Sequence, residues 1–203
     1  KRFSLEWYME GTRSRSGKLM PPRYGLLTYV VDAYRRAKAE DVFLIPVAIA
    51  YDQISDVAGY AAEERGAKKQ AESLSWAIKV VRALRRPYGD IYIRFGEPVS
   101  LAAALGPPDP HAEPHTDEVN LGLQKLAFEV SVRINRVTPI TPTSLVTLAL
   151  LGAGRALSVE ETVVRLKNLV NYVRRRQLPT SVPLELDTPA GVQHALDALV
   201  KND

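Results

Sequence analysis

Nine residues near the N-terminus have the types and spacing that would bind an anion. One carboxylate, two glycines, three hydroxyls and three cations fall between Glu10 and Lys18. Glycine lets the backbone approach a ligand closely, and hydroxyls donate hydrogen bonds. The guanidinium groups of Arg13 and Arg15 match the paired oxygens of a phosphate or carboxylate. The stretch predicts an anion cradle whose candidate residues are Glu10, Gly11, Thr12, Arg13, Ser14, Arg15 and Lys18.

The same composition is also typical of an ordinary solvated loop. Neither a hydrophobic period nor a complete phosphate-loop motif is present, because the spacing from Gly11 to Gly17-Lys18 is not that of a Walker sequence. Nucleotide binding of that type is therefore not expected, and the choice between cradle and loop depends on what surrounds the stretch.

The elements beside the cradle favour an α/β sheet edge. Apolar residues at odd positions from Phe3 to Met9 predict a strand with one buried face. Ligands of open α/β sheets bind at the carboxyl ends of strands, where this stretch would lie. After the turn at residues 21–25, apolar residues recur at helical spacing over residues 26–40.

The next run, residues 42–51, is apolar almost without interruption. Such a run predicts a strand buried on both faces of a covered sheet. Pro46 is anomalous in its middle because proline cannot donate to a strand ladder. It indicates a bulge, a sheet edge or a break near a site.

Further along, residues 60–64 and 72–85 predict helices, with a basic loop around Lys69 between them, and residues 91–95 predict a strand. The fold class expected for residues 1–105 is α/β, a partial mixed sheet flanked by helices. Residues 106–118 contain four prolines and predict a linker. Its His111 and His115 are four apart, but a proline-rich loop is a poor frame for a metal pair.

Residues 119–203 predict a helical C-terminal region. One helix has an apolar stripe from Leu123 to Ile134, and the next begins at Thr141-Pro142. Ser158 followed by Glu161 forms a capping box, and Thr188-Pro189 begins the last helix. The cations Arg174 to Arg176 lie near the C-terminal end of the third of these helices, where positive charges interact favourably with the helix dipole.

Composition excludes several classes of function. The chain has 203 residues, a net charge of +4 and no cysteine, so it has no disulfide, thiolate nucleophile or cysteine metal site. A basic chain favours acidic partners such as phosphorylated substrates or anionic lipid. Nucleic acid is not expected, because the cations are scattered and no aromatic stacking array accompanies them. No apolar run approaches the length of a membrane span.

Several ordered blocks resemble the glycerol-3-phosphate acyltransferases, most closely the bacterial membrane-bound type. The first block is residues 9–18 followed by Pro22-Arg23-Tyr24-Gly25, and the second is Ile45-Pro46-Val47 leading into Ala50-Tyr51-Asp52. Further similar stretches are residues 65–69 with 72–74, Phe95-Gly96-Glu97-Pro98 and Val132-Arg133-Ile134-Asn135. The resemblance covers about residues 1 to 175.

The resemblance implies acyl transfer from acyl-CoA or acyl carrier protein to the 1-hydroxyl of glycerol 3-phosphate. It implies no cofactor and no metal. On this basis Arg13 and Arg15 bind the phosphate, while Glu10 orients a glycerol hydroxyl or holds an arginine. Pro46 matches the family's proline and is therefore counted among the substrate-binding candidates, and Lys69 is a further anion-binding candidate. Peripheral attachment to an anionic membrane, at the cytoplasmic face of the plasma membrane, is expected from the family.

The chain departs from the family's pattern at the catalytic base. The family's chemistry uses a His, four residues and then an Asp, in which the His removes the hydroxyl proton. Thr116, Asn120 and Leu199 stand five positions after the three histidines. We therefore expect an acyltransferase C-terminal part whose His-Asp block lies upstream of Lys1. The alternative is a non-catalytic module that binds anions or a membrane surface.

Overall fold

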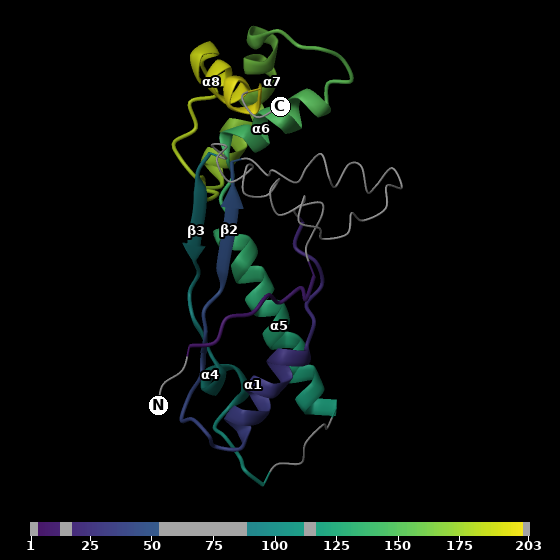
Figure 1. The fold of residues 1–203 in the computed structure, drawn as a ribbon, viewed down its shortest axis with the longest axis vertical. Helices are drawn as coiled ribbons and strands as arrows, with labels where there is room; N and C mark the ends of the chain where they lie inside the picture. Colours follow the sequence, from purple (N-terminus) through teal and green to yellow (C-terminus); the bar gives the residue numbers. More distant parts are fainter. Residues whose placement is uncertain (1–3, 13–17, 53–88, 112–116, 201–203) are drawn as a thin grey trace, which may run out of the picture. The chain divides into compact units, whose positions relative to one another are not determined.

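The computed structural model describes residues 4–12, 18–52, 89–111 and 117–200. In these ranges the chain is a mixed α/β protein with six helices and two small two-stranded sheets (Figure 1). In chain order the elements are α1 Gly25–Arg35, β1 Phe43–Leu44, β2 Val47–Tyr51, β3 Ile91–Phe95, β4 Val99–Ser100, α4 Leu101–Leu105, α5 Asp117–Val137, α6 Pro142–Leu151, α7 Val159–Arg175 and α8 Pro189–Val200. The chain divides into two compact units, Lys1–Ala48 with Ile93–Thr138 and Ile49–Tyr92 with Pro139–Asp203.

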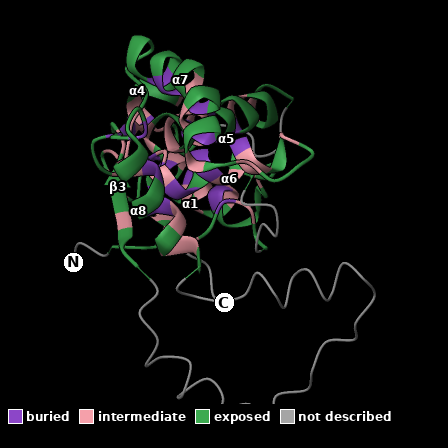
Figure 2. Cartoon of the chain, turned by 90° about the horizontal axis from the view of Figure 1, so that it is seen from above, coloured by how far each residue is buried: buried purple, intermediate pink, exposed green. Residues whose placement is uncertain are grey.

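The core of the first unit lies between α1, α4, α5 and the β1–β4 pair. Its buried members are Met9, Leu27, Val31, Tyr34, Leu44, Val99, Leu101, Leu123, Leu126, Ala127 and Val130. The helical stripe predicted from Leu123 to Ile134 is confirmed, since four of its residues are buried and Ile134 packs against them. Figure 2 shows the buried positions of α1 and α5 in purple and their outer positions in green.

The apolar run at residues 42–51 forms two strands with one buried face. β1 pairs with β4 antiparallel, Leu44 opposite Val99, and β2 pairs with β3 in a separate sheet. The prediction of a strand buried on both faces is wrong here: Leu44, Pro46 and Ala48 are buried, whereas the alternate side chains Phe43, Ile45 and Val47 are exposed. Side chains alternate between the two faces of a strand, and only one face has a core against it.

Pro46 stands at the break between the two strands, as the sequence suggested. It cannot donate a ladder hydrogen bond, but its carbonyl accepts one from the Gly96 backbone N–H at 2.8 Å. Beyond β2 the Asp52 N–H donates to the Asp90 carbonyl at 3.1 Å. Positions 46 and 52 thus meet 96 and 90, so β2 and β3 run antiparallel, as their arrows show in Figure 1.

The second unit has its described core between α6, α7 and α8. It contains Leu145, Val146, Ala149, Leu166, Val170, Val173, Leu184, Leu186, Val192 and Ala195. The helix starts at Thr141-Pro142 and Thr188-Pro189 are confirmed, and Thr141 accepts from the Ser144 N–H at 3.1 Å. The capping box at Ser158 is confirmed with both of its hydrogen bonds.

Three other local predictions differ from the structure or lie outside it. The described residues before the cradle, Ser4 to Met9, form no strand; Met9 is buried in the core, and its carbonyl accepts from the Arg23 N–H. The helix expected to reach residue 40 ends at Arg35, because Ala37 has a positive φ of 53°. The helices predicted at 60–64 and 72–85 lie outside the described residues.

Candidate functional site

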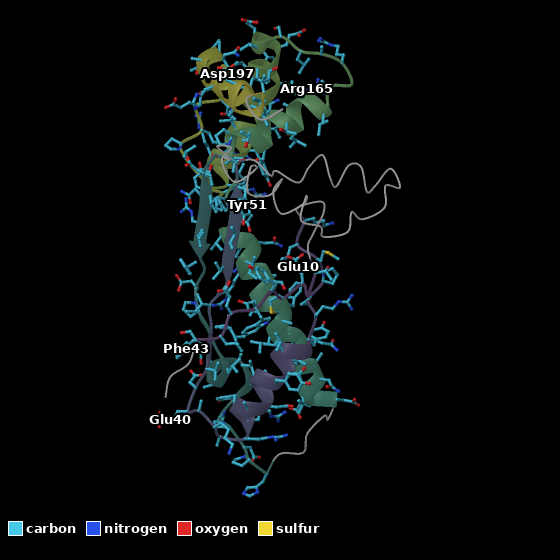
Figure 3. All side chains as sticks on the ribbon, viewed as in Figure 1. Glu10, Glu40, Phe43, Tyr51, Arg165 and Asp197 are labelled. Atoms are coloured by element: carbon cyan, nitrogen blue, oxygen red, sulfur yellow. The ribbon has the colours of Figure 1, made fainter. Side chains whose placement is uncertain are left out.

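The two ends of the cradle are held together by its own carboxylate. Glu10, labelled in Figure 3, lies in irregular chain before α1, and its Oε2 accepts from the Met20 backbone N–H at 2.9 Å. Just beside it, the Arg23 N–H donates to the Met9 carbonyl at 2.7 Å. A charged acceptor strengthens a hydrogen bond to a backbone amide. The two ends of the segment from residue 10 to residue 20 therefore lie beside each other and form what we call the loop base.

Gly11 is required by the conformation of that base. Its φ is +65°, and its N–H donates to the Tyr8 carbonyl at 3.2 Å, which closes a tight turn. A Cβ at this position would lie 3.0 Å from Cγ of Arg23. The glycine therefore allows both the left-handed turn and the close passage of the Arg23 side chain. Thr12 follows it with its hydroxyl 3.9 Å from Sδ of Met20.

The structure brings together only part of the predicted site. Glu10, Gly11 and Thr12 meet Met20 and Arg23 at the loop base. Lys18 is exposed in irregular chain two residues before Met20. Arg13, Ser14, Arg15 and Lys69 lie outside the described residues, so their roles stay predictions.

Pro46 is fully buried, so its side chain faces the protein. A Cβ on Gly96 would lie 3.3 Å from the Pro46 Cβ and 3.5 Å from Val137 of α5. Gly96 is thus packed between the proline and the helix. Pro46 therefore affects the local backbone through its packing and its missing N–H. Its neighbours Ile45 and Val47 have exposed side chains.

Sequence reasoning did not anticipate that Arg133 binds the chain opposite this break. From α5 its guanidinium donates to the carbonyls of Glu97 (3.0 Å) and Pro98 (2.8 Å) and to Oε1 of Glu129 (2.7 Å). Three of the family-like blocks, at Ile45-Pro46-Val47, at Gly96 to Pro98 and at Arg133, therefore meet in one place. The available signal was the Glu129–Arg133 spacing of four residues, typical of a helical ion pair.

Asp41 fastens the other end of the β1–β4 pair. Its carboxylate accepts from the Ser100 hydroxyl at 2.6 Å and from the Ala102 N–H at 3.0 Å. The Ser100 hydroxyl bond, with the backbone donor of Ala102, lowers the pKa of Asp41. The Val42 carbonyl accepts from the Leu101 N–H at 3.0 Å. These bonds hold β4 and α4 beside β1.

In the second unit, Asp52 of the family-like Ala50-Tyr51-Asp52 block makes structural contacts. Its Oδ2 accepts from the Tyr92 hydroxyl at 3.1 Å and the Asp90 N–H at 3.3 Å. Burial, followed by the Asp52 charge, raises the pKa of Tyr92. Gly89, at φ +73°, passes so close that a Cβ there would lie 2.9 Å from Asp52. Asp52 therefore joins the end of β2 to the start of β3.

Among the described residues, no three His, Asp or Glu side chains gather in a way that could hold a metal ion. No helix in the same ranges combines the length and apolar composition needed to cross a bilayer.

Comparison with known proteins places these blocks in a family. Residues 60–203 match the model of the glycerol-3-phosphate acyltransferase C-terminal region. The chain is 35% identical over 199 residues to a presumed acyltransferase, plsB1, of Mycobacterium tuberculosis, and equally to its Mycobacterium bovis counterpart. It is 33% identical over 211 residues to a glycerol-3-phosphate acyltransferase of Pseudomonas entomophila.

These matches cover 97% of this chain but only 31% of the mycobacterial proteins and 25% of the Pseudomonas enzyme. The alignments therefore include both the cradle and the helical region. Because the family model alone matches well over half of the chain, the relationship does not depend on the cradle motif. The chain belongs to the glycerol-3-phosphate acyltransferase family and contains its C-terminal region.

Proposed function

We propose that this chain supplies the acceptor-binding part of a glycerol-3-phosphate 1-O-acyltransferase of the bacterial membrane-bound type. The complete reaction moves an acyl chain from acyl-CoA or acyl carrier protein to the 1-hydroxyl of glycerol 3-phosphate, the first step of phospholipid synthesis. The observation that carries the proposal is the loop between Glu10 and Met20, closed by a 2.9 Å charged hydrogen bond in a chain of this family. Residues 1–105 then correspond to the second half of the acyltransferase domain.

The closed base supports a phosphate site at this stretch. Because Glu10 and Gly11 hold the base, the two ends of the segment that contains Arg13, Ser14 and Arg15 in its sequence lie close together. Two guanidinium groups and a hydroxyl supply enough donors for the oxygens of a phosphate. The Glu10 Oε2 atom is occupied by the Met20 N–H, so we assign Glu10 chiefly to holding the loop.

The chain binds the acceptor but does not activate it. Attack on an acyl thioester requires removal of the hydroxyl proton by a positioned base. The sequence contains no His followed five positions later by Asp. A radiolabelled acyl-transfer assay on the 203-residue chain is therefore expected to show no turnover, and measurable turnover would contradict this assignment of roles.

The proposed location is the cytoplasmic face of the plasma membrane, with peripheral attachment. The support is physical and general: a net charge of +4 attracts anionic lipid surfaces. The acyl acceptor is water-soluble, whereas its acylated product is a lipid, so acyl transfer next to a membrane delivers the product where it partitions.

Replacement of Arg13 by Ala tests the acceptor site. Titration calorimetry with glycerol 3-phosphate is expected to show binding to the unmodified chain and a dissociation constant at least about tenfold higher for Arg13→Ala. The reason is that one charged hydrogen bond contributes about 1.5–3 kcal/mol. Arg36→Ala, at an exposed arginine after α1, is the control and is expected to leave binding unchanged.

Two results would oppose the proposal. Unchanged affinity in Arg13→Ala would remove the arginine from the phosphate site. Equal affinity for inorganic phosphate, glycerol 3-phosphate and anionic vesicles would favour a non-catalytic anion-binding module, because such a module has no reason to recognise the glycerol hydroxyls.

A further inference from the structure

The break at Pro46 faces an extra residue on the opposite chain. Leu44 is paired with Val99, and the Pro46 carbonyl accepts from Gly96. One residue, Ile45, lies between Leu44 and Pro46, whereas two residues, Glu97 and Pro98, lie between Gly96 and Val99 on the opposite chain. The chain from β3 to β4 therefore contains a one-residue bulge opposite Ile45. Strand pairing changes from the β2–β3 sheet to the β1–β4 sheet at this bulge.

A bulge leaves backbone groups without ladder partners, and here α5 supplies the partner. Arg133 donates through one guanidinium nitrogen to both carbonyls of the bulge, at 3.0 Å from Glu97 and 2.8 Å from Pro98. Glu129, one helical turn before, accepts from Nε at 2.7 Å. The Arg133 guanidinium is thus held on one side by Glu129 of its own helix and on the other by the two carbonyls of the bulge.

The contact reaches Pro46 through Gly96. The Gly96 N–H donates to the Pro46 carbonyl, and a Cβ at Gly96 would lie 3.3 Å from the Pro46 Cβ and 3.5 Å from Val137, so the glycine is closely packed between them. Val137 lies one helical turn after Arg133 on α5. Two turns of one helix therefore fix the bulge and the glycine beside it, and both fix the course of the chain at Pro46.

We propose that Arg133 is a positioning residue for the acceptor site, acting through the Glu97–Pro98 bulge on the chain around Pro46. The inference rests on the proposed function, with Pro46 taken as a substrate-binding residue because it matches the family's proline. Arg133 itself need not touch the substrate. Its guanidinium group donates to two backbone carbonyls, and these hydrogen bonds hold the buried Pro46 and its exposed neighbours in one conformation.

The experiment combines hydrogen exchange with ligand binding. Wild-type chain, Arg133→Met and Arg133→Lys are compared, with Arg136→Met as the matched control because Arg136 is an exposed arginine on the same helix. Exchange of the Gly96 amide is followed by mass spectrometry or NMR, and the dissociation constant of glycerol 3-phosphate is measured by calorimetry. Thermal unfolding of each variant shows whether it is folded.

In Arg133→Met the Gly96 amide is expected to exchange faster, and the dissociation constant is expected to rise about tenfold, since small displacements of positioning groups have effects of this size or larger. Arg133→Lys keeps the charge but not the planar fork, so it is expected to move both readouts in the same direction by less. Arg136→Met is expected to match wild type in both.

Unchanged Gly96 exchange in Arg133→Met would overturn the inference, and so would faster exchange with unchanged affinity, which would leave Arg133 a purely structural role. If Arg133→Met does not fold, Arg133→Lys decides by the same two readouts. Failure of the proposed function is distinguishable, because wild-type chain would then not bind glycerol 3-phosphate at all.

Discussion

Single carboxylates organise the described loops by accepting hydrogen bonds from backbone amides. Glu10 binds the Met20 N–H, Asp41 binds the Ala102 N–H, and Glu161 binds the Ser158 N–H at 2.8 Å. In each case a charged acceptor satisfies an amide that has no strand or helix partner of its own. The pattern explains how the base of the cradle, the β4–α4 junction and the start of α7 are each held in place.

Tyr34 offers a residue-scale test of how the chain after α4 is held. It is buried in the core, and its hydroxyl donates to the Gly106 carbonyl at 2.7 Å; burial, then the Asp41 charge, raises the pKa of Tyr34. Tyr34→Phe is expected to lower the free energy of unfolding by about 1 kcal/mol, because the carbonyl loses its donor. Urea unfolding measures this difference.

Tyr29→Phe is the matched control for that substitution. Tyr29 lies on the same helix but is largely exposed, so loss of its hydroxyl is expected to change the free energy of unfolding by less than about 0.5 kcal/mol. Equal effects of the two substitutions would show that the Tyr34–Gly106 hydrogen bond contributes nothing to stability.

At the scale of elements, the start of α7 is the most completely capped helix end among the described residues. Ser158 accepts from the Glu161 N–H at 3.2 Å, and Glu161 accepts from the Ser158 N–H. Arg155 adds a two-nitrogen contact to the same carboxylate, at 2.7 and 3.2 Å. Hydrogen bonding by Arg155, then by the Ser158 backbone, lowers the pKa of Glu161 from 4.5 to about 2.

This lowered pKa predicts a pH-dependent contribution to stability. Because the folded state favours the charged carboxylate, the contribution is present above the unfolded pKa near 4.5 and is lost as pH falls toward 2. Glu161→Gln is therefore expected to be less stable than wild type at neutral pH, with a difference that shrinks below pH 4.5 and disappears near pH 2. Thermal unfolding across this range measures the difference.

Glu118→Gln provides the control for helix-dipole effects. Glu118 also lies in the first turn of a helix, α5, and its side chain is exposed. A difference from wild type that follows the same pH course in both variants would assign the effect to the dipole and remove the Arg155–Glu161 contact as its cause.

At the scale of the whole molecule, the first unit exposes an apolar sheet face. The exposed side chains share odd residue numbers, and Phe43 and Phe95 are 62% and 70% exposed; the set is Phe43, Ile45, Val47, Ile93 and Phe95. The opposite face, with Leu44, is covered by the core. An exposed apolar face of this kind promotes association and aggregation.

The paired substitution Ile45→Thr with Phe95→Thr tests that consequence. Threonine keeps the strand propensity of both positions while removing apolar surface. The variant is expected to bind less of an apolar fluorescent dye and to stay in solution at higher concentration, with an unfolding midpoint close to wild type. Dye fluorescence and light scattering measure the first two effects.

Leu44→Thr is the control on the buried face of the same strand. It is expected to cost about 2 kcal/mol or more of stability, because it puts a hydroxyl and a cavity into the core. Similar losses of stability in the exposed pair and in Leu44→Thr would show that the odd positions are covered in solution.

The sequence by itself determined the features that depend on neighbours in the chain. The caps at Thr141, Ser158 and Thr188, the stripe of α5 and the β3 strand follow from local hydrogen bonding and periodicity, so their residue types were sufficient. The blocks that indicated the family are likewise local patterns, and they predicted an anion-binding stretch whose two ends the structure brings together.

Only the tertiary structure decided the features that join distant segments. The Arg133 contact with Glu97 and Pro98 spans more than thirty residues, and the Glu10 contact depends on where residue 20 returns. The apolar sequence of residues 42–51 is also compatible with a strand buried on one face and with a strand buried on both. Which of the two forms depends on whether another part of the protein packs on the second face, and the sequence pattern of the strand does not determine that packing.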